Sequence, residues 1–362
     1  MSSSATVSVS SVTFNGAQDR FVVASSEGIA VYGASPLVDL KIIPYSIVGS
    51  VRYATLLRRT NLIAMVGGGT HAKFAENAVL VYDDLTEKFI LEITLPSPVR
   101  SVHFAYTKLV TVCQRRLDVF SLPAEAPAAG CRPLHAAETR TEACDVAAED
   151  PHSELVAYAA GKMGQVHLMD LRQVSEKAAP SAGCVQAHEH DVALLALSGH
   201  GTLLATGSVV GTLIRVFDTK SRRLLAEFRR GSEPANLYSL RFSGCAEYAV
   251  ASSDKGTVHV FAVRDAHTRP RSLLQQVGGV MGAEERRALA LFSLDERAVC
   301  AFAPPAATGA QLKKSVVALC QDGTYHKFGF AADGTVAREA FDHFLDVGSD
   351  RDFWRADAAD DY

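Results

Sequence analysis

The amino-acid sequence predicts an all-β fold, a closed seven-bladed WD-type β-propeller. Three observations carry this prediction. A short strand pattern that ends on a large apolar residue occurs seven times along the chain. Its copies follow one another at intervals of 38 to 50 residues, apart from a last interval of 67, and one four-stranded propeller blade takes roughly 40–45 residues. The 26 glycines and 13 prolines among 362 residues suit many short strands joined by turns.

The recurring segment is the expected third strand of each blade. Most copies follow a turn and end on a large, usually aromatic, residue. In chain order they are Gly28–Tyr32, Ala78–Tyr82, Arg116–Phe120, Gln165–Met169, Thr212–Phe217, Thr257–Phe261 and Thr324–Phe328. A β-rich run before each copy supplies the preceding strand, as in Leu203–Ser208 and Tyr248–Ser253. Seven copies therefore predict seven blades, and radial closure protects most of the strand edges.

The expected domain is a single propeller over residues 1–345, followed by an acidic, mobile tail at 346–362. The last interval exceeds the others by roughly 20 residues, and an excess of this size is often a functional loop. We place it at about 262–288, directly after the third strand of blade six.

Composition and motifs exclude several classes of function. A net charge of −4 argues against broad attraction to nucleic acid. The seven cysteines are odd in number and form no CxxC pair, which argues against a disulfide framework and a zinc cluster. No catalytic or phosphate-loop motif is present, so we expect a non-enzyme without a cofactor or metal. Asp83 and Asp84 could resemble a metal pair, but turn capping is the preferred interpretation.

The chain has no run of about 18 apolar residues, and its first residues lack the pattern of a signal peptide. We therefore expect a cytoplasmic protein, and a monomer in solution.

The most specific sequence motif of the chain is centred on Phe228-Arg-Arg-Gly231. If Arg229 and Arg230 lie in extended backbone, their side chains project to opposite sides, so one dipeptide can serve two pockets. Each guanidinium presents a planar fork of donors that suits phosphate oxygens. Gly231 would remove a side chain where the backbone must turn.

This region resembles the PROPPIN family, the seven-bladed phosphoinositide-binding propellers of autophagy and endolysosomal traffic. The resemblance rests on Ala187-His188, Gly201–Ser208, Gly211–Asp218, Phe228–Gly231, Leu237–Ser243 and Ser252–Phe261. The resemblance extends over residues 10–345. Further segments similar to the family are Phe14-Asn15, Glu27–Tyr32, Thr60–Gly69 and Val81–Asp84.

The resemblance implies that the chain binds phosphatidylinositol 3-phosphate and 3,5-bisphosphate at two sites. The first site would combine Arg229 with Arg215, Ser208, Thr212 and His188. The second would combine Arg230 with Ser252, Ser253, Lys255, Thr257 and His259.

Other interpretations of these residues stay open. His188 could instead pin a turn, as a histidine does in WD-type blades, and Thr212 and Thr257 could serve β-propensity alone. If His188 and His259 lie beside phosphates, the negative charge favours their protonation, so binding should strengthen on mild acidification.

The loop at 262–288 is the expected membrane-inserting element. Its apolar centre comprises Leu273, Leu274, Val277, Val280 and Met281, and flanking arginines would meet anionic headgroups. The alternative is a surface insertion whose apolar residues are incidental.

The expected function is that of a peripheral membrane adaptor, recruited to pre-autophagosomal, endosomal or vacuolar/lysosomal membranes. By resemblance, its partners would be the lipid-transfer or conjugation machinery of autophagy. In the family an edge of the early blades recruits a lipid-transfer protein, and Asn15 with Asp19 is the nearest match, in a segment two residues longer here. The alternative is a protein-interaction scaffold with weak or no lipid selectivity, because fold alone does not fix function.

Overall fold

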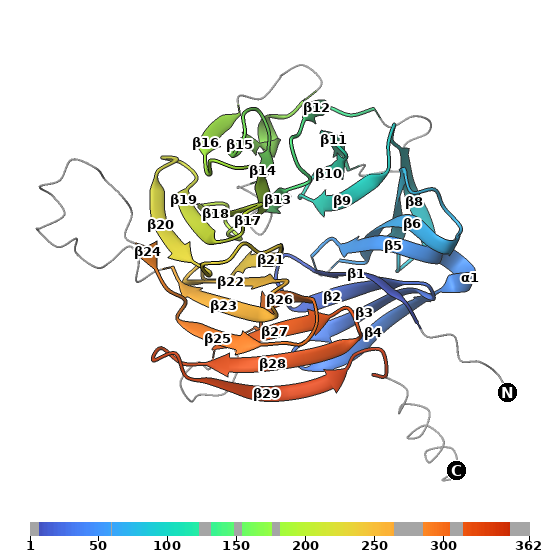
Figure 1. The fold of residues 1–362 in the computed structure, drawn as a ribbon. Coiled ribbons are helices and arrows are strands. Elements are labelled where there is room, and N and C mark those ends of the chain that lie inside the picture. Colours follow the sequence, from blue (N-terminus) through green and yellow to red (C-terminus); the bar gives the residue numbers. More distant parts are fainter. Residues whose placement is uncertain are drawn as a thin grey trace, which may run out of the picture.

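A computed structural model describes residues 7–58, 60–122, 132–147, 154–175, 182–263, 285–304 and 314–347 of the chain. The strands form seven sheets arranged in a ring (Figure 1). The expectation of an all-β, seven-bladed propeller is confirmed.

Strands that follow one another in the sequence form each blade, except that β24, which lies between two strands of blade six in the sequence, joins blade five. Blade one holds β1 (Val9–Phe14), β2 (Arg20–Ser25), β3 (Gly28–Ala34) and β4 (Leu37–Pro44). The short helix α1 (Tyr45–Val48) leads to blade two. Blade two holds β5 (Gly49–Leu56), β6 (Leu62–Ala72), β7 (Ala78–Asp83) and β8 (Lys88–Thr94). Blade three holds β9 (Val99–Phe104), β10 (Lys108–Cys113), β11 (Arg116–Ser121) and β12 (His135–Glu138). Blade four holds β13 (Cys144–Ala147), β14 (Leu155–Ala159), β15 (Gln165–Asp170) and β16 (Gly183–Gln186), with the 3-10 turn η1 (Leu171–Gln173) after β15.

The site lies on the later blades. Blade five holds β17 (Val192–Leu197), β18 (Leu203–Ser208), β19 (Leu213–Asp218) and β20 (Leu224–Arg229), and β24 (Glu285–Arg286) adds to its edge. Blade six holds β21 (Leu237–Phe242), β22 (Tyr248–Ser253), β23 (Thr257–Ala262) and β25 (Ala290–Ser293). Blade seven holds β26 (Ala298–Phe302), β27 (Lys314–Cys320), β28 (Thr324–Phe330) and β29 (Val336–His343).

The seven recurring segments are the third strands of the seven blades, as expected. They coincide with β3, β7, β11, β15, β19, β23 and β28, and only β19 begins one residue later than its segment. The two runs expected as second strands, β18 and β22, are also confirmed. The pattern was readable because the inner strands of a blade are covered on both faces and carry mainly apolar residues.

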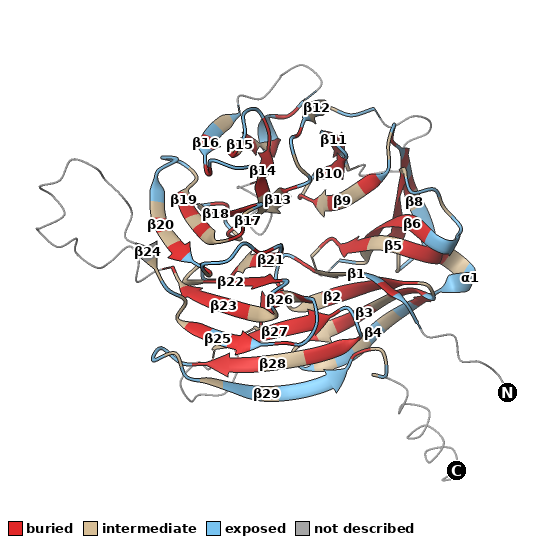
Figure 2. Ribbon diagram, viewed as in Figure 1, coloured by how far each residue is buried: buried red, intermediate tan, exposed pale blue. Residues whose placement is uncertain are grey.

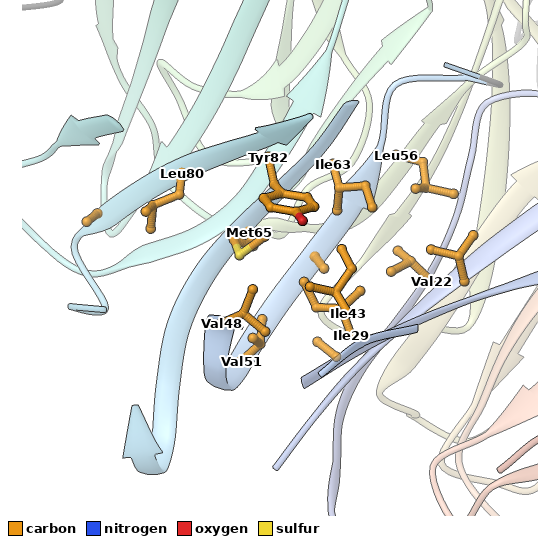
Figure 3. Packing of buried hydrophobic residues seen from close by; sticks show 14 residues of the cluster. Val22, Ile29, Ile43, Val48, Val51, Leu56, Ile63, Met65, Leu80 and Tyr82 are labelled. Atoms are coloured by element: carbon orange, nitrogen blue, oxygen red, sulfur yellow. The ribbon is translucent and has the colours of Figure 1, made fainter. Parts of the chain in front are cut away.

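One apolar cluster fills each junction between neighbouring blades. Figure 2 shows buried residues along the inner strands and exposed ones on outer strands such as β29. Figure 3 shows the junction of blades one and two, where Val22 and Ile29 lie against Ile63, Met65 and Tyr82. Each strand therefore has one face toward the preceding blade and one toward the next.

Within the described ranges, the ring closes between blades seven and one through contacts of side chains and not through a shared sheet. Blade seven consists of β26 to β29, and among the residues that the structure describes no strand from the start of the chain joins it. The Tyr325 hydroxyl donates to the Ala34 carbonyl at 2.9 Å across this junction. Phe344, fully buried just after β29, contacts the rings of Phe21 and Tyr32 at centroid distances of 5.6 and 5.9 Å.

The packed part of the chain extends slightly past the expected boundary at residue 345. Leu345 and Val347 both pack against the cluster between blades seven and one. The rest of the proposed tail, residues 348–362, lies outside the described residues.

Asn15, the nearest match to the family's partner-contacting residue, is a buried residue of the turn between β1 and β2. Its side chain is 1% exposed. The Asn15 Nδ2 donates to the Asp19 carboxylate at 2.8 Å and to the Arg58 carbonyl at 3.0 Å. These bonds fix the conformation of the turn that also carries Asp19.

The same turn carries a bond across the ring. The Gln18 Nε2 donates to the Phe242 carbonyl of blade six at 2.7 Å, and its Oε1 accepts the Phe302 amide of blade seven at 2.8 Å. The turn between β1 and β2 therefore links blade one to blades six and seven.

Because no strand crosses the closing junction, we expect Phe344→Ala to lower the free energy of unfolding by about 3–5 kcal/mol, the usual cost of deleting a buried phenylalanine. Phe341→Ala is the matched control, since Phe341 is 51% exposed on β29 and its loss should cost less than about 1 kcal/mol. Urea denaturation of both variants measures the difference. Equal effects would contradict the importance of this junction.

Candidate functional site

The strand β20 places its residues alternately on the two faces of blade five. Phe228 belongs to the cluster between blades five and six. Arg229 ends the strand, is exposed, and lies opposite Leu213 in the register, on the face that also carries Arg215. That face is turned toward blade four, because Phe217 of the same face belongs to the cluster between blades four and five.

Arg230 points toward the junction between blades five and six. We call the rim of the junction between blades four and five the first groove and the rim of the junction between blades five and six the second groove. The Arg230 side chain is 7% exposed, and its charge contributes to lowering the pKa of His259 on blade six. The Arg230 Nε donates to the Gly211 carbonyl and Nη2 to the Glu233 carbonyl, both at 2.6 Å. The two arginines therefore lie on opposite faces of blade five and reach separate grooves.

Gly231 does not have the role expected of it. Its φ lies outside the left-handed region, and a Cβ added there would meet no atom within 4 Å. The turn after Arg230 therefore does not require glycine, and the position faces open space.

In the first groove, hydrogen bonds join three strands of blade five to the chain leaving blade four. The Arg215 Nε contacts Glu227 Oε2 at 2.6 Å, and its Nη1 donates to the Ala187 carbonyl at 2.8 Å. The His188 Nε2 lies 3.0 Å from Thr206 Oγ1. His188 is thus a bonded, buried residue, which agrees with the structural interpretation of it.

The hydroxyl residues proposed for this groove lie at the turn between β18 and β19. Ser208 is buried and shares a face of β18 with Thr206. Thr212 directly precedes β19, and its carbonyl accepts the Arg230 amide at 2.8 Å. A Cβ on Gly207 would lie 2.2 Å from Leu237 Cδ1 in blade six. Gly207 therefore accommodates packing on the other face and does not shape the first groove.

The second groove gathers four of the five residues proposed to accompany Arg230. Ser253 Oγ accepts the Lys255 amide at 3.4 Å, and Thr257 Oγ1 donates to the Lys255 carbonyl at 3.4 Å. The Lys255 ammonium lies 3.6 Å from the Glu233 carboxylate. His259 is 6% exposed, and neither of its ring nitrogens has a hydrogen-bond partner among the described residues.

Ser252 is not in this groove, which corrects its proposed place in the second site. Its Oγ donates to the Ala298 carbonyl of blade seven at 2.7 Å. Neighbouring strand residues face opposite sides, and Val250, on the face of Ser252, packs between blades six and seven. Only Ser253 of the serine pair therefore faces Arg230.

Both histidines are held neutral in the ligand-free fold. Burial lowers the pKa of His188 to about 4, with a further contribution from the charge of Arg215. Burial and then the charge of Arg230 lower the pKa of His259 to about 4. At pH 6 to 8 both rings are therefore neutral, and stronger binding on mild acidification would require a bound phosphate to raise the pKa of a ring into that range.

Other sequence-based expectations fall outside the two grooves. Asp83 accepts the amides of Leu85 and Thr86, so its interpretation as a turn cap is confirmed. Within the part of the chain that the structure describes, no three metal-ligating side chains gather. No helix among those residues is long and apolar enough to cross a bilayer.

The segment proposed as an insertion lies between β23 of blade six and β24, which pairs with blade five. Residues 264–284, including the five apolar residues proposed to insert, lie outside the described ranges. The following strand β24 pairs in parallel with β20, with Arg286 opposite Phe228 (Figure 1). The return end of the insertion is therefore bonded to the strand that carries Arg229.

Comparison with known proteins identifies the family. The PROPPIN family model matches residues 134–286, which include both grooves from Ala187 to His259. Ectopic P granules protein 6 of Caenorhabditis elegans is 30% identical over 364 residues, covering 97% of this chain and 90% of that protein. The chain belongs to the PROPPIN family.

Other PROPPINs agree in sequence and in fold. SVP1-like protein 2 of Saccharomyces cerevisiae is 29% identical over 283 residues, or 70% of this chain and 62% of the relative. The structure of Kluyveromyces lactis Hsv2 superposes with a TM-score of 0.74 at 20% identity, covering 94% and 100% of the two chains. KlAtg21, solved in complex with the coiled coil of AgAtg16, has a TM-score of 0.69 at 20% identity over 93% and 99%. PROPPINs are non-enzymatic propellers, which agrees with the expectation for this chain.

Sequence reasoning missed two residues of the first groove, Glu227 and Thr206. Glu227 lies two residues before Arg229 in a strand, and that spacing puts it on the same face. The same rule would have separated Ser252 from Ser253. The carbonyls of Gly211 and Glu233 that hold Arg230 have no signal in the sequence.

The depressed histidine pKa values predict a loss of stability in acid. The unfolded chain binds protons near pH 6.5, whereas the folded rings resist them down to about pH 4, so the free energy of unfolding should fall as the pH drops through this window. Between pH 7 and 5 each ring should cost about 2 kcal/mol.

Urea denaturation at pH 7 and pH 5 measures this loss of unfolding free energy. In His259→Gln the loss should be smaller by the contribution of one imidazole ring. His71→Gln, at an exposed position of blade two, is the control. It should leave the loss of unfolding free energy between pH 7 and 5 unchanged. If His259→Gln loses as much unfolding free energy between pH 7 and 5 as the wild type, the buried imidazole is not the source of the acid sensitivity.

Proposed function

We propose that this PROPPIN is a peripheral membrane adaptor that binds phosphatidylinositol 3-phosphate and 3,5-bisphosphate at two sites. The observation that carries the proposal is the division of Arg229 and Arg230 between two grooves. Family membership supports the choice of ligand.

The second groove has the features of a preformed anion site. A buried imidazole without hydrogen bonds costs free energy, and a phosphate or inositol hydroxyl beside His259 would recover it. Arg230 uses two of its five N–H groups on the Gly211 and Glu233 carbonyls, which orient its guanidinium. Ser253, Lys255 and Thr257 border the same groove and would supply further donors.

The first groove would bind a second headgroup through Arg229 and Arg215. Arg229 is exposed at the rim, and Arg215 lies deeper beside His188. Ser208 and Thr212 at the neighbouring turn would contact inositol hydroxyls. Hydroxyl groups can both donate to and accept from a sugar-like ring.

Membrane attachment would combine these two sites with the insertion of blade six. Leu273, Leu274, Val277, Val280 and Met281 are proposed to enter the bilayer interface. The pairing of β24 with β20 supports this, because it brings the return end of the insertion to the strand that carries Arg229. Contacts of modest strength on one rigid body reinforce one another.

The early blades are proposed to recruit partners of the autophagy lipid-transfer or conjugation machinery. Val38, Leu40 and Ile42 of β4 on blade one are 37%, 46% and 60% exposed and form an apolar stripe on an edge strand, a feature typical of binding surfaces. KlAtg21 of the same fold is known in complex with a coiled coil of AgAtg16. These observations also favour the second candidate function, a scaffold propeller without lipid selectivity.

The test is co-sedimentation with liposomes that contain a few per cent phosphatidylinositol 3-phosphate. Arg229→Thr should lower the bound fraction several-fold at unchanged thermal stability, because Arg229 is exposed. Arg230→Thr should lower binding and also cost about 1–3 kcal/mol of stability, because it removes the partner of the buried Gly211 carbonyl and of the part-buried Glu233 carbonyl. The double variant should not bind.

Phosphatidylserine liposomes of matched charge are the lipid control, and Arg132→Thr, at an exposed position before β12, is the protein control. Sedimentation that is equal with both lipids, or retained by the double variant, would refute the proposed function. The scaffold function would then remain.

A further inference from the structure

We propose that Glu227 is a positioning residue of the first phosphoinositide site, which orients Arg215 for the headgroup. The inference rests on the proposed function and deepens it. It starts from the 2.6 Å contact between Glu227 Oε2 and Arg215 Nε, directly across the register of β19 and β20.

The ion pair is well sheltered, since the side chains of Arg215 and Glu227 are 27% and 17% exposed. A solvent-exposed pair of this kind would be weak and variable in geometry. Here the short contact comes with the bond from Arg215 Nη1 to the Ala187 carbonyl. Two acceptors on separate elements, β20 and the chain leaving blade four, thus fix the plane of the guanidinium.

Fixing the guanidinium has a clear use in a phosphate site. Two of the five N–H groups are taken by Glu227 and Ala187, and the others keep a defined direction. An arginine without these acceptors would lose rotamer entropy on binding, which would weaken the complex.

Arg230, which follows Arg229 in the sequence, is oriented in the same way. Arg230 also uses two N–H groups on acceptors, the carbonyls of Gly211 and Glu233. In the second groove both acceptors are neutral backbone groups. In the first groove one of them is a carboxylate, so its charge opposes a phosphate while its geometry favours one.

These two effects of Glu227 predict different mutant behaviour. If orientation dominates, removal of the acceptor weakens binding even though it removes a negative charge. If repulsion dominates, the same change tightens binding. The part-buried, two-point fixation of Arg215 favours orientation, because a carboxylate already paired with a guanidinium repels a phosphate less than a free one.

The experiment measures binding of soluble inositol 1,3-bisphosphate by calorimetry, with the second site silenced by Arg230→Thr. If that parent is too unstable, Lys255→Ala with His259→Ala silences the second site instead. Glu227→Ala should weaken binding about 5- to 10-fold, the loss expected for a charge-assisted hydrogen bond in a polar site. Glu227→Gln should stay within about 2-fold of the parent, because its amide oxygen accepts the same N–H.

Glu233→Ala is the matched control, since its carboxylate lies in the second groove beside Lys255 and its backbone carbonyl is retained. It should leave first-site affinity unchanged. Melting temperatures show whether each variant is folded.

Unchanged or tighter binding by Glu227→Ala would overturn the proposal, and so would Glu227→Gln binding as weakly as Glu227→Ala. A wild-type protein that binds no headgroup would instead refute the proposed function itself.

Discussion

The whole architecture depends on each blade being buried on both faces. In a ring of packed sheets, the pleat sends neighbouring residues of a strand into two different junctions. Phe217 packs toward blade four and Val216 toward blade six. The same rule, continued to the rim of blade five, sends Arg229 and Arg230 into different grooves. The apolar junctions and the divided arginine pair are therefore two consequences of one geometry.

The polar groups of the site are held by a balance between burial and bonding. Arg230 and Glu227 lie where an unpaired charge would be costly, and each has a nearby partner. His259 differs from them, because it is buried, has no hydrogen-bond partner in the described part of the chain, and is neutral near pH 7. A site that keeps its donors in place before the ligand arrives loses less entropy on binding.

Much of the fold could be predicted from the sequence. The third strands were readable because a large residue such as Phe261 ends each one, and the divided roles of Arg229 and Arg230 followed from extended backbone. The faces of Ser252 and Ser253 required the phase of β22, which packing against blade seven sets. The burial of Asn15 and the acceptors of Arg230 depend on backbone groups that no residue type announces.

The central claim is that one dipeptide serves two independent sites, and the stoichiometry of headgroup binding tests it most directly. Calorimetric titration with soluble inositol 1,3-bisphosphate should give two equivalents bound to the wild-type protein. Arg229→Thr and Arg230→Thr should each retain one equivalent, with the remaining affinity unchanged. A single equivalent for the wild type, or the loss of all binding in either single variant, would contradict the account.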